Sequence, residues 1–98
     1  MAGVVEVIQF VVTKHREQFI RDRPLIDAYL HSVTPGFKGS ELLEAAGNKF
    51  YLLVYWEDEG TVIAAQAFTE NAPDVKAWAG LADQFLAFDT AVVRHSSR

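Results

Sequence analysis

The chain has 98 residues, half of them hydrophobic, which predicts one packed domain rather than a disordered segment. Thirteen acidic residues against nine Lys and Arg give a net charge of −4. An acidic chain without a basic cluster argues against a nucleic-acid or anionic-membrane partner. The sequence has no cysteine, which excludes a disulfide scaffold, thiolate metal sites and a cysteine nucleophile.

The N-terminal apolar stretch does not read as a targeting segment. It lacks a basic region and a small-residue cleavage site, and Glu6 interrupts it. No run in the sequence approaches the ~20 apolar residues that a membrane span needs. We therefore expect a cytoplasmic protein without a membrane partner.

The first predicted strand covers residues 4–12 and is rich in β-branched residues. Thr13 is placed to cap a helix over residues 14–33, where apolar residues recur at a nearly helical spacing. Pro24 lies inside this helix. Because an interior proline costs about 3 kcal/mol, we expect a bend near residues 21–23 or two helical pieces.

A turn over residues 34–36, with proline followed by glycine, ends the helix. A second strand over residues 37–46 follows, with Gly39 at a bulge. Gly47-Asn48 then signals a hairpin into a third strand over residues 49–56. That third strand is apolar on both faces: Phe50, Leu52, Val54 and Trp56 on one, Tyr51, Leu53 and Tyr55 on the other.

Acidic residues 57–59 suit the start of a helix that we predict over residues 61–69. Asn71-Ala72-Pro73 interrupts it, and a second helical piece covers about residues 74–84. The apolar face of this piece carries Val75, Trp78, Leu81 and Phe85. The last strand is predicted over residues 86–94.

The order β-α-β-β-α-β predicts an α+β, ferredoxin-like fold, in which both helical segments cover one face of a four-stranded antiparallel sheet. We expect a single domain over residues 1–98, with its core at about 4–94 and a tail at 95–98. The opposite face of the sheet would carry apolar residues of the third strand, and a second copy of the chain is the simplest cover for them. We expect a homodimer with the sheets face to face, and with Tyr51, Leu53 and Tyr55 at its interface.

Two short motifs, Thr34-Pro35-Gly36-Phe37 and Tyr55-Trp56-Glu57-Asp58, resemble the antibiotic biosynthesis monooxygenase family of the dimeric α/β-barrel superfamily. With the order of elements, the resemblance covers about residues 4–94. It implies a cavity between the helices and the sheet of each protomer. Some members of the family oxidise polycyclic aromatic or quinol substrates with O2 and without metal or flavin, and related members bind and cleave haem.

The resemblance extends unevenly to single residues. Trp56 matches the tryptophan that lines the family's cavity. Leu52 and Val62 stand where the aromatic-polyketide oxygenases have Asn and Tyr. Trp78 stands where the haem-cleaving members have an iron-binding His, and Gln9 falls near their first-strand Asn. The absent Asn and Tyr favour an alternative function, a non-catalytic small-molecule-binding or accessory dimer. A weaker alternative is a haem-binding or haem-degrading protein.

Each candidate residue also has a purely structural interpretation. Trp56 and Trp78 are aromatic walls for a planar ligand or plain core residues. Gln9 orients a substrate or is an amide satisfied within the fold, and Gln66 is similar. His31 near the helix end is a base at a pocket mouth or a favourable partner of the helix terminus.

Tyr29 could face the cavity from the first helix. We interpret Arg21 and Arg23 as solvated charges, with guarding a cavity mouth for an anionic substrate as the alternative. No His-x-x-x-His spacing occurs, so we expect no metal held by the protein, and the family resemblance implies no cofactor.

The function that the resemblance implies is cofactor-independent monooxygenation, by O2, of a hydrophobic phenolic, quinol or polycyclic aromatic small molecule. The residues we expect to act in catalysis are Trp56, Gln9, His31 and Tyr29. Those we expect to line the cavity are Leu52, Val62, Gln66 and Trp78.

Overall fold

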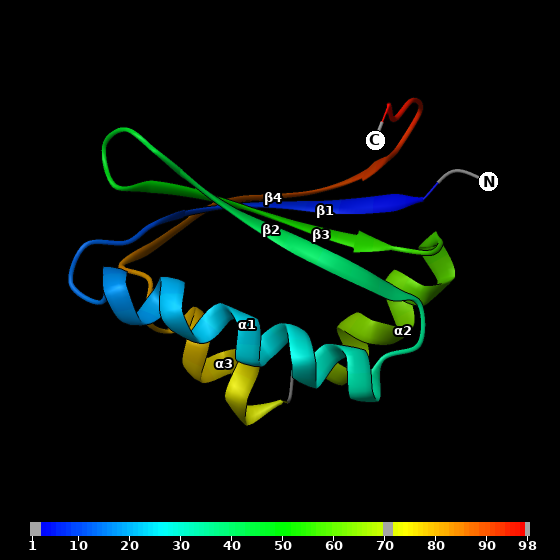
Figure 1. Ribbon diagram of the computed structural model, residues 1–98, viewed down its shortest axis with the longest axis horizontal. Helices are drawn as coiled ribbons and strands as arrows, with labels where there is room; N and C mark the ends of the chain where they lie inside the picture. The colour runs from blue at the N-terminus through cyan, green and yellow to red at the C-terminus, as the bar shows by residue number, and fades with distance from the viewer. Residues whose placement is uncertain (1–2, 70–71, 98) are drawn as a thin grey trace.

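The computed structural model describes residues 3–69 and 72–97 as one antiparallel sheet with three helices, all on the same side of it (Figure 1). The sheet has the strand order β2-β3-β1-β4. Its strands are β1 (Val4–Val11), β2 (Phe37–Ala45), β3 (Lys49–Trp56) and β4 (Gln84–Val92). The helices are α1 (Arg16–Val33), α2 (Glu59–Thr69) and α3 (Pro73–Ala79). The predicted ferredoxin-like α+β fold is confirmed.

The two central strands follow the predicted alternation. In β3 every second residue is buried, and β1 pairs with it so that Glu6 lies opposite Val54 and Phe10 opposite Phe50. The even-numbered residues of both strands therefore face the helices, and the odd-numbered ones face the other side. The apolar residues packed between sheet and helices form one core, built on Val4, Phe10, Phe19, Ile26, Leu30, Phe50, Leu52, Val54, Trp56 and Trp78.

The alternative of two helical pieces around Pro24 is wrong, because α1 runs without a break over 18 residues. Pro24 is on the exposed side of the helix, where water can satisfy the carbonyl that the proline leaves unpaired. The opposite side of α1 is anchored in the core by Phe19, Ile26 and Leu30. Packing of that face outweighs the local cost of the proline.

Thr13 does not cap α1, because the residue before the helix is His15, which makes no capping bond with its side chain. The backbone N–H and the hydroxyl of Thr13 instead donate to the two carboxylate oxygens of Asp83, each at 2.8 Å. These bonds lower the pKa of Asp83 below its ordinary value. They tie the segment after β1 to the segment before β4.

The second helical piece is shorter than predicted. It ends at Ala79, and Phe85, expected on its apolar face, belongs to β4. The backbone N–H of Asp83 donates to the carbonyl of Val11 at 2.8 Å, and the ladder with β1 starts at Gln84. Pairing with the open edge of β1 thus takes this segment into the sheet. The expected break at residues 71–73 falls partly outside the described residues, since Asn71 is not among them.

Glycine sets the turns on both sides of β2. Gly47 and Asn48, with φ of 77° and 61°, form the predicted hairpin loop. Gly36 has φ of 88° and packs so closely that a Cβ there would lie 2.2 Å from a methyl carbon of Thr61. The register shifts between Phe37 and Gly39, which confirms the predicted bulge.

Within residues 3–69 and 72–97, no helix is long and apolar enough to cross a membrane.

The aromatic cluster around Phe19 predicts a large stability loss on truncation. Phe19 is fully buried, stacks on Trp78 at 4.2 Å between ring centres and meets Phe50 edge-on at 5.4 Å. We expect Phe19→Ala to lower the free energy of unfolding by about 3–5 kcal/mol in urea denaturation. Leu25→Ala, on the same helix but 68% exposed, should change it by less than about 0.5 kcal/mol. Equal losses in the two variants would contradict this packing.

Candidate functional site

A cavity of about 490 Å³ lies between the inner face of the sheet and the helices. Every strand except β2 and all three helices contribute to its wall. Most of the wall is apolar, and its aromatic members are Phe10, Trp56, Trp78, Phe85 and Phe88. Only three lining residues are polar among those described: Glu6, Arg23 and Gln66. The cavity therefore offers an apolar ligand a mainly apolar wall with few, well-defined polar contacts.

The wall is most open on the β4 side. Phe85 and Phe88 line the cavity yet are 58% and 42% exposed, whereas Phe10, on the neighbouring strand, is 4% exposed. Phe85 meets Phe10 edge-on at 5.8 Å, so the aromatic wall continues from the interior to the surface. A ligand would enter beside β4.

Glu6 is the buried carboxylate of the cavity. The alternation of β1 turns it toward the helices, and it is only 6% exposed. Trp56 Nε1 donates to Glu6 Oε1 at 2.6 Å, and Gln66 Nε2 donates to Oε2 at 3.1 Å. Each carboxylate oxygen keeps accepting capacity beyond these two bonds. The arrangement holds this carboxylate in a fixed orientation against an apolar space.

Gln66 reaches Glu6 because the start of α2 is fixed. Asp58 Oδ1 accepts hydrogen bonds from the backbone N–H of Thr61 at 2.8 Å and from its hydroxyl at 2.6 Å. These bonds lower the pKa of Asp58 and satisfy an N–H group at the helix N-terminus. The acidic segment expected to begin this helix does so, with Asp58 just before its first turn.

Arg23 is the buried cation of the cavity. It shares the buried face of α1 with Phe19 and Ile26, and its side chain is only 7% exposed. Its Nε donates to Asp27 Oδ1 at 3.0 Å, and its guanidinium carbon lies 4.8 Å from the centre of the Trp78 ring. Burial lowers the pKa of Arg23, while the nearby charges of Asp27 and Glu6 act in the opposite direction.

The expectation that Arg23 is solvated is therefore wrong, whereas Arg21 is 71% exposed as expected. The helical spacing of Phe19, Arg23, Ile26 and Leu30 carries the signal for this burial, since these positions fall on one face. The alternation of Val4, Glu6 and Phe10 likewise places Glu6 inside. Both residues were accessible to pattern analysis and were missed because charged side chains are usually exposed.

Four of the predicted residues meet in the cavity: Trp56, Trp78, Leu52 and Gln66 all line it. Val62 is 2% exposed and packs in the core, but it is not part of the lining.

The predicted partners Gln9, His31 and Tyr29 do not join Trp56 in this cavity. Gln9 is an odd-numbered residue of β1, opposite Tyr51, and so faces the other side of the sheet. His31 is exposed near the end of α1, where its ring meets Phe37 edge-on at 4.6 Å.

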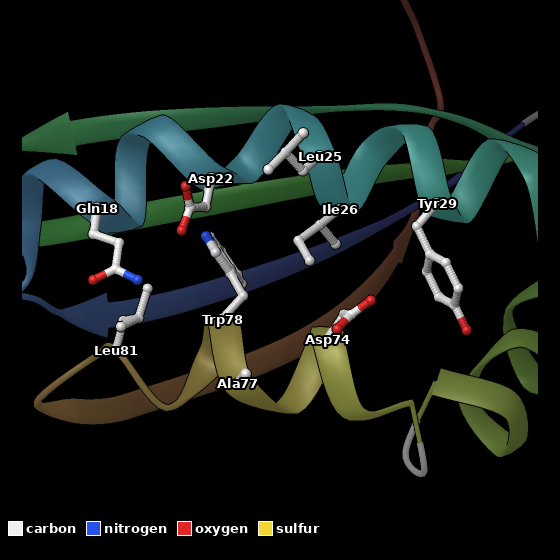
Figure 2. A pocket seen from close by; sticks show the side chains of 9 residues that line it. All are labelled: Gln18, Asp22, Leu25, Ile26, Tyr29, Asp74, Ala77, Trp78 and Leu81. Atoms are coloured by element: carbon white, nitrogen blue, oxygen red, sulfur yellow. The ribbon is translucent and has the colours of Figure 1, made fainter.

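Tyr29 lines a separate hollow of about 330 Å³ between α1 and α3. Figure 2 shows it projecting from α1 beside Asp74, with Asp22 further along the same helix. Ile26 and Trp78 border both this hollow and the central cavity.

Within residues 3–69 and 72–97, no three His, Cys, Asp or Glu side chains are grouped to hold a metal ion.

Comparison with solved structures finds the same fold in several proteins. A variant of SnoaB, a cofactor-independent oxygenase from Streptomyces nogalater, is 20% identical; 97% of this chain aligns with 96% of that one at a TM-score of 0.71. A proposed antibiotic biosynthesis monooxygenase from Chloroflexus aurantiacus J-10-fl is 13% identical, with 98% and 97% of the chains covered and a TM-score of 0.67. A dimeric ferredoxin-like protein from an uncultured marine organism is 8% identical, with 98% and 91% covered and a TM-score of 0.69.

No protein-family model matches the sequence, and no curated protein matches it. The shared feature is thus the fold over nearly the whole chain, and it confirms the structural resemblance to antibiotic biosynthesis monooxygenases.

The bond between Trp56 and Glu6 predicts an energetic coupling of these two residues. Removing the indole N–H leaves a buried carboxylate with one donor fewer, which costs about 1–3 kcal/mol. A double-mutant cycle of Trp56→Phe and Glu6→Leu, measured by urea denaturation, should therefore show a coupling of at least about 1 kcal/mol, since Leu cannot accept the indole hydrogen bond. Additive effects would mean that the bond contributes nothing to stability and that the two side chains only pack together.

Proposed function

We propose that the protein is a cofactor-independent monooxygenase acting on a phenolic, quinol or related polycyclic aromatic small molecule. The observation that carries this proposal is Glu6, a hydrogen-bonded carboxylate buried in a cavity whose wall is otherwise mainly apolar and aromatic. The fold shared with SnoaB, itself described as a cofactor-independent oxygenase, supports the same class of reaction.

In the proposed reaction the protein has two tasks, which are to accept a proton and to limit access of water to the reacting atoms. Glu6 takes an acidic proton from the ring system, and the resulting carbanion gives electrons to O2. A C–O bond then forms at the deprotonated carbon. Loss of water from the hydroperoxide leaves a carbonyl, so a ring CH2 and O2 become C=O and H2O. The substrate supplies the electrons, and no other reductant is consumed.

The remaining wall suits such a substrate. A volume of about 490 Å³ lies in the range of small-molecule sites, about 300–1,000 Å³. Trp56 and Trp78 present aromatic surface at two sides, and Trp56 also fixes the carboxylate. In this proposal Trp56 and Gln66 are positioning residues, and Glu6 is the catalytic base.

Oxygen uptake with anthrones, naphthols and quinols, without added cofactor, tests this function. We expect uptake above the buffer rate with at least one class, and a loss of about 10²–10⁴-fold in Glu6→Gln, since Gln cannot accept the proton. Glu57→Gln, an exposed residue outside the cavity wall, is the matched control and should keep full activity. Uptake that Glu6→Gln leaves unchanged would contradict the assigned base.

The alternative of a non-catalytic small-molecule-binding dimer is favoured by Leu52, which contributes an apolar side chain to the cavity wall. Saturable binding of these aromatics without any oxygen uptake would support it. Haem binding is disfavoured by Trp78, because an indole N–H is only a hydrogen-bond donor and cannot bind iron; here it donates to the carbonyl of Phe19 at 2.8 Å. A Soret shift on adding haem would reverse that judgement.

We also propose that a second copy of the chain covers the outer face of the sheet. Tyr51, Leu53 and Tyr55 lie on that face opposite Gln9, Val7 and Val5 of β1, and all are only partly buried in the single chain. Tyr55 donates from its hydroxyl to Glu41 at 2.7 Å, which satisfies the polar atom and leaves its ring for packing. An apolar face of this kind is unfavourable in water, and a two-fold contact would bury it.

Analytical ultracentrifugation tests the dimer. Leu53→Lys puts a charge at the centre of the proposed contact and should shift the protein to monomers. Leu25→Lys, on the exposed side of α1, is the matched control and should sediment like the unaltered protein. A monomeric unaltered protein, or a dimer that persists in Leu53→Lys, would contradict the proposal.

A further inference from the structure

Arg23 forms the wall between the central cavity and a smaller hollow of about 350 Å³ beside β2. Its described hydrogen-bond acceptors, Asp27 Oδ1 at 3.0 Å and Ser40 Oγ at 3.3 Å, both belong to residues that line the hollow and not the cavity. Ser40 itself donates to Asp27 at 2.8 Å, which fixes this side of the guanidinium. The protein thus satisfies Arg23 from the hollow side only.

The guanidinium of Arg23 is incompletely hydrogen-bonded. Its Nη2 is buried and lies 2.9 Å from Asp27 Oδ1, an oxygen that Nε already uses, but it makes no hydrogen bond with a described residue. Nη2 is thus on the Asp27 side and covered by the protein. None of the described residues that line the cavity accepts a hydrogen bond from Arg23, so the residue has no acceptor on its cavity side. An oxygen atom of a ligand in the cavity can supply one.

The charges around the cavity limit what that ligand can be. Glu6 from β1 and Arg23 from α1 both line it, and their opposite charges interact. Asp27 is the other charged group that acts on Arg23. A ligand between the two walls finds a proton acceptor at Glu6 and a hydrogen-bond donor at Arg23. The Trp78 ring, which stacks on Phe19 and lies against the guanidinium, also borders the cavity.

We propose that Arg23 binds an oxygen atom of the substrate that becomes negatively charged when Glu6 removes the proton. The substrate class is then an aromatic compound whose acidic position is conjugated to a carbonyl or hydroxyl oxygen. Charge developing on that oxygen gains a charge-assisted hydrogen bond from Arg23. This inference rests on the proposed function of the same cavity, and it makes Arg23 a catalytic residue beside Glu6.

Equilibrium binding tests the site without requiring turnover. The probes are 2-hydroxynaphthoquinone, a stable anion at neutral pH, and its neutral methyl ether. They are compared in Glu6→Gln, because Gln reproduces the uncharged state of Glu6 after proton transfer. Binding is measured by quenching of tryptophan fluorescence. We expect the anion to bind at least about tenfold more tightly than the ether.

Arg23→Met added to Glu6→Gln should bring the two affinities within about twofold of each other by removing the charge-assisted bond. Arg21→Met, which removes an exposed charge from the same helix, should preserve the preference. Equal affinities in Glu6→Gln, or a preference that survives Arg23→Met, would overturn the proposal.

Asp27→Asn provides a second test that keeps Arg23 in place, should Arg23→Met not fold. It removes the carboxylate that competes for the guanidinium, so the anion should bind at least about threefold more tightly than to Glu6→Gln alone. Unchanged or weaker binding would overturn the proposal. Because binding is measured apart from oxygen uptake, a preference for the anion without uptake would retain the Arg23 site and reject the oxygenase.

Discussion

The burial of two opposite charges in an aromatic interior is the constraint on which the rest of the site depends. An isolated buried carboxylate or guanidinium costs several kcal/mol, and both Glu6 and Arg23 are more than nine-tenths buried. Each is tolerated because neighbouring groups compensate it. Trp56 and Gln66 donate to Glu6, whereas Asp27 and Ser40 accept from Arg23. These four partners come from different elements, so the charges also fix how helices and sheet sit on one another.

The same contacts connect the fold to the proposed chemistry. Trp56 ends β3, next to the turn into α2, and its indole N–H holds the carboxylate of Glu6. Asp58 then starts α2 in an orientation that brings Gln66 to the other carboxylate oxygen. The short segment around Trp56, which resembles the family motif, thus builds one side of the cavity. Its tryptophan packs in the core and also donates to Glu6, so packing and the role in the proposed reaction do not exclude each other.

Much of the fold follows from local patterns in the sequence. Alternation in β3, the turn glycines and the order of elements are local signals, and the structure agrees with them. The predictions from sequence were wrong where tertiary contacts overrode a local preference. Pro24 did not divide α1 because the opposite face is packed, and Phe85 joined β4 because the edge of β1 was free to pair.

The site was harder to predict than the fold. The residues chosen for their polar chemistry, Gln9, His31 and Tyr29, lie outside the central cavity, because side-chain direction on a strand or helix decides access. These three residues were predicted to be catalytic from residue type alone. Strand alternation and helical spacing each indicate that Glu6 and Arg23 are buried, but that the two line one cavity follows only from the packing of α1 on β1.

Infrared difference spectroscopy on anaerobic mixing with an anthrone tests the central claim most directly. Without O2 the reaction stops after proton transfer, so both partners of that step can be observed together. We predict that the absorption of the deprotonated anthrone appears together with a new carboxylic-acid C=O band. In Glu6→Gln, neither the anion absorption nor this band should appear. Formation of the anion without that band, or its undiminished formation in Glu6→Gln, would show that Glu6 is not the proton acceptor.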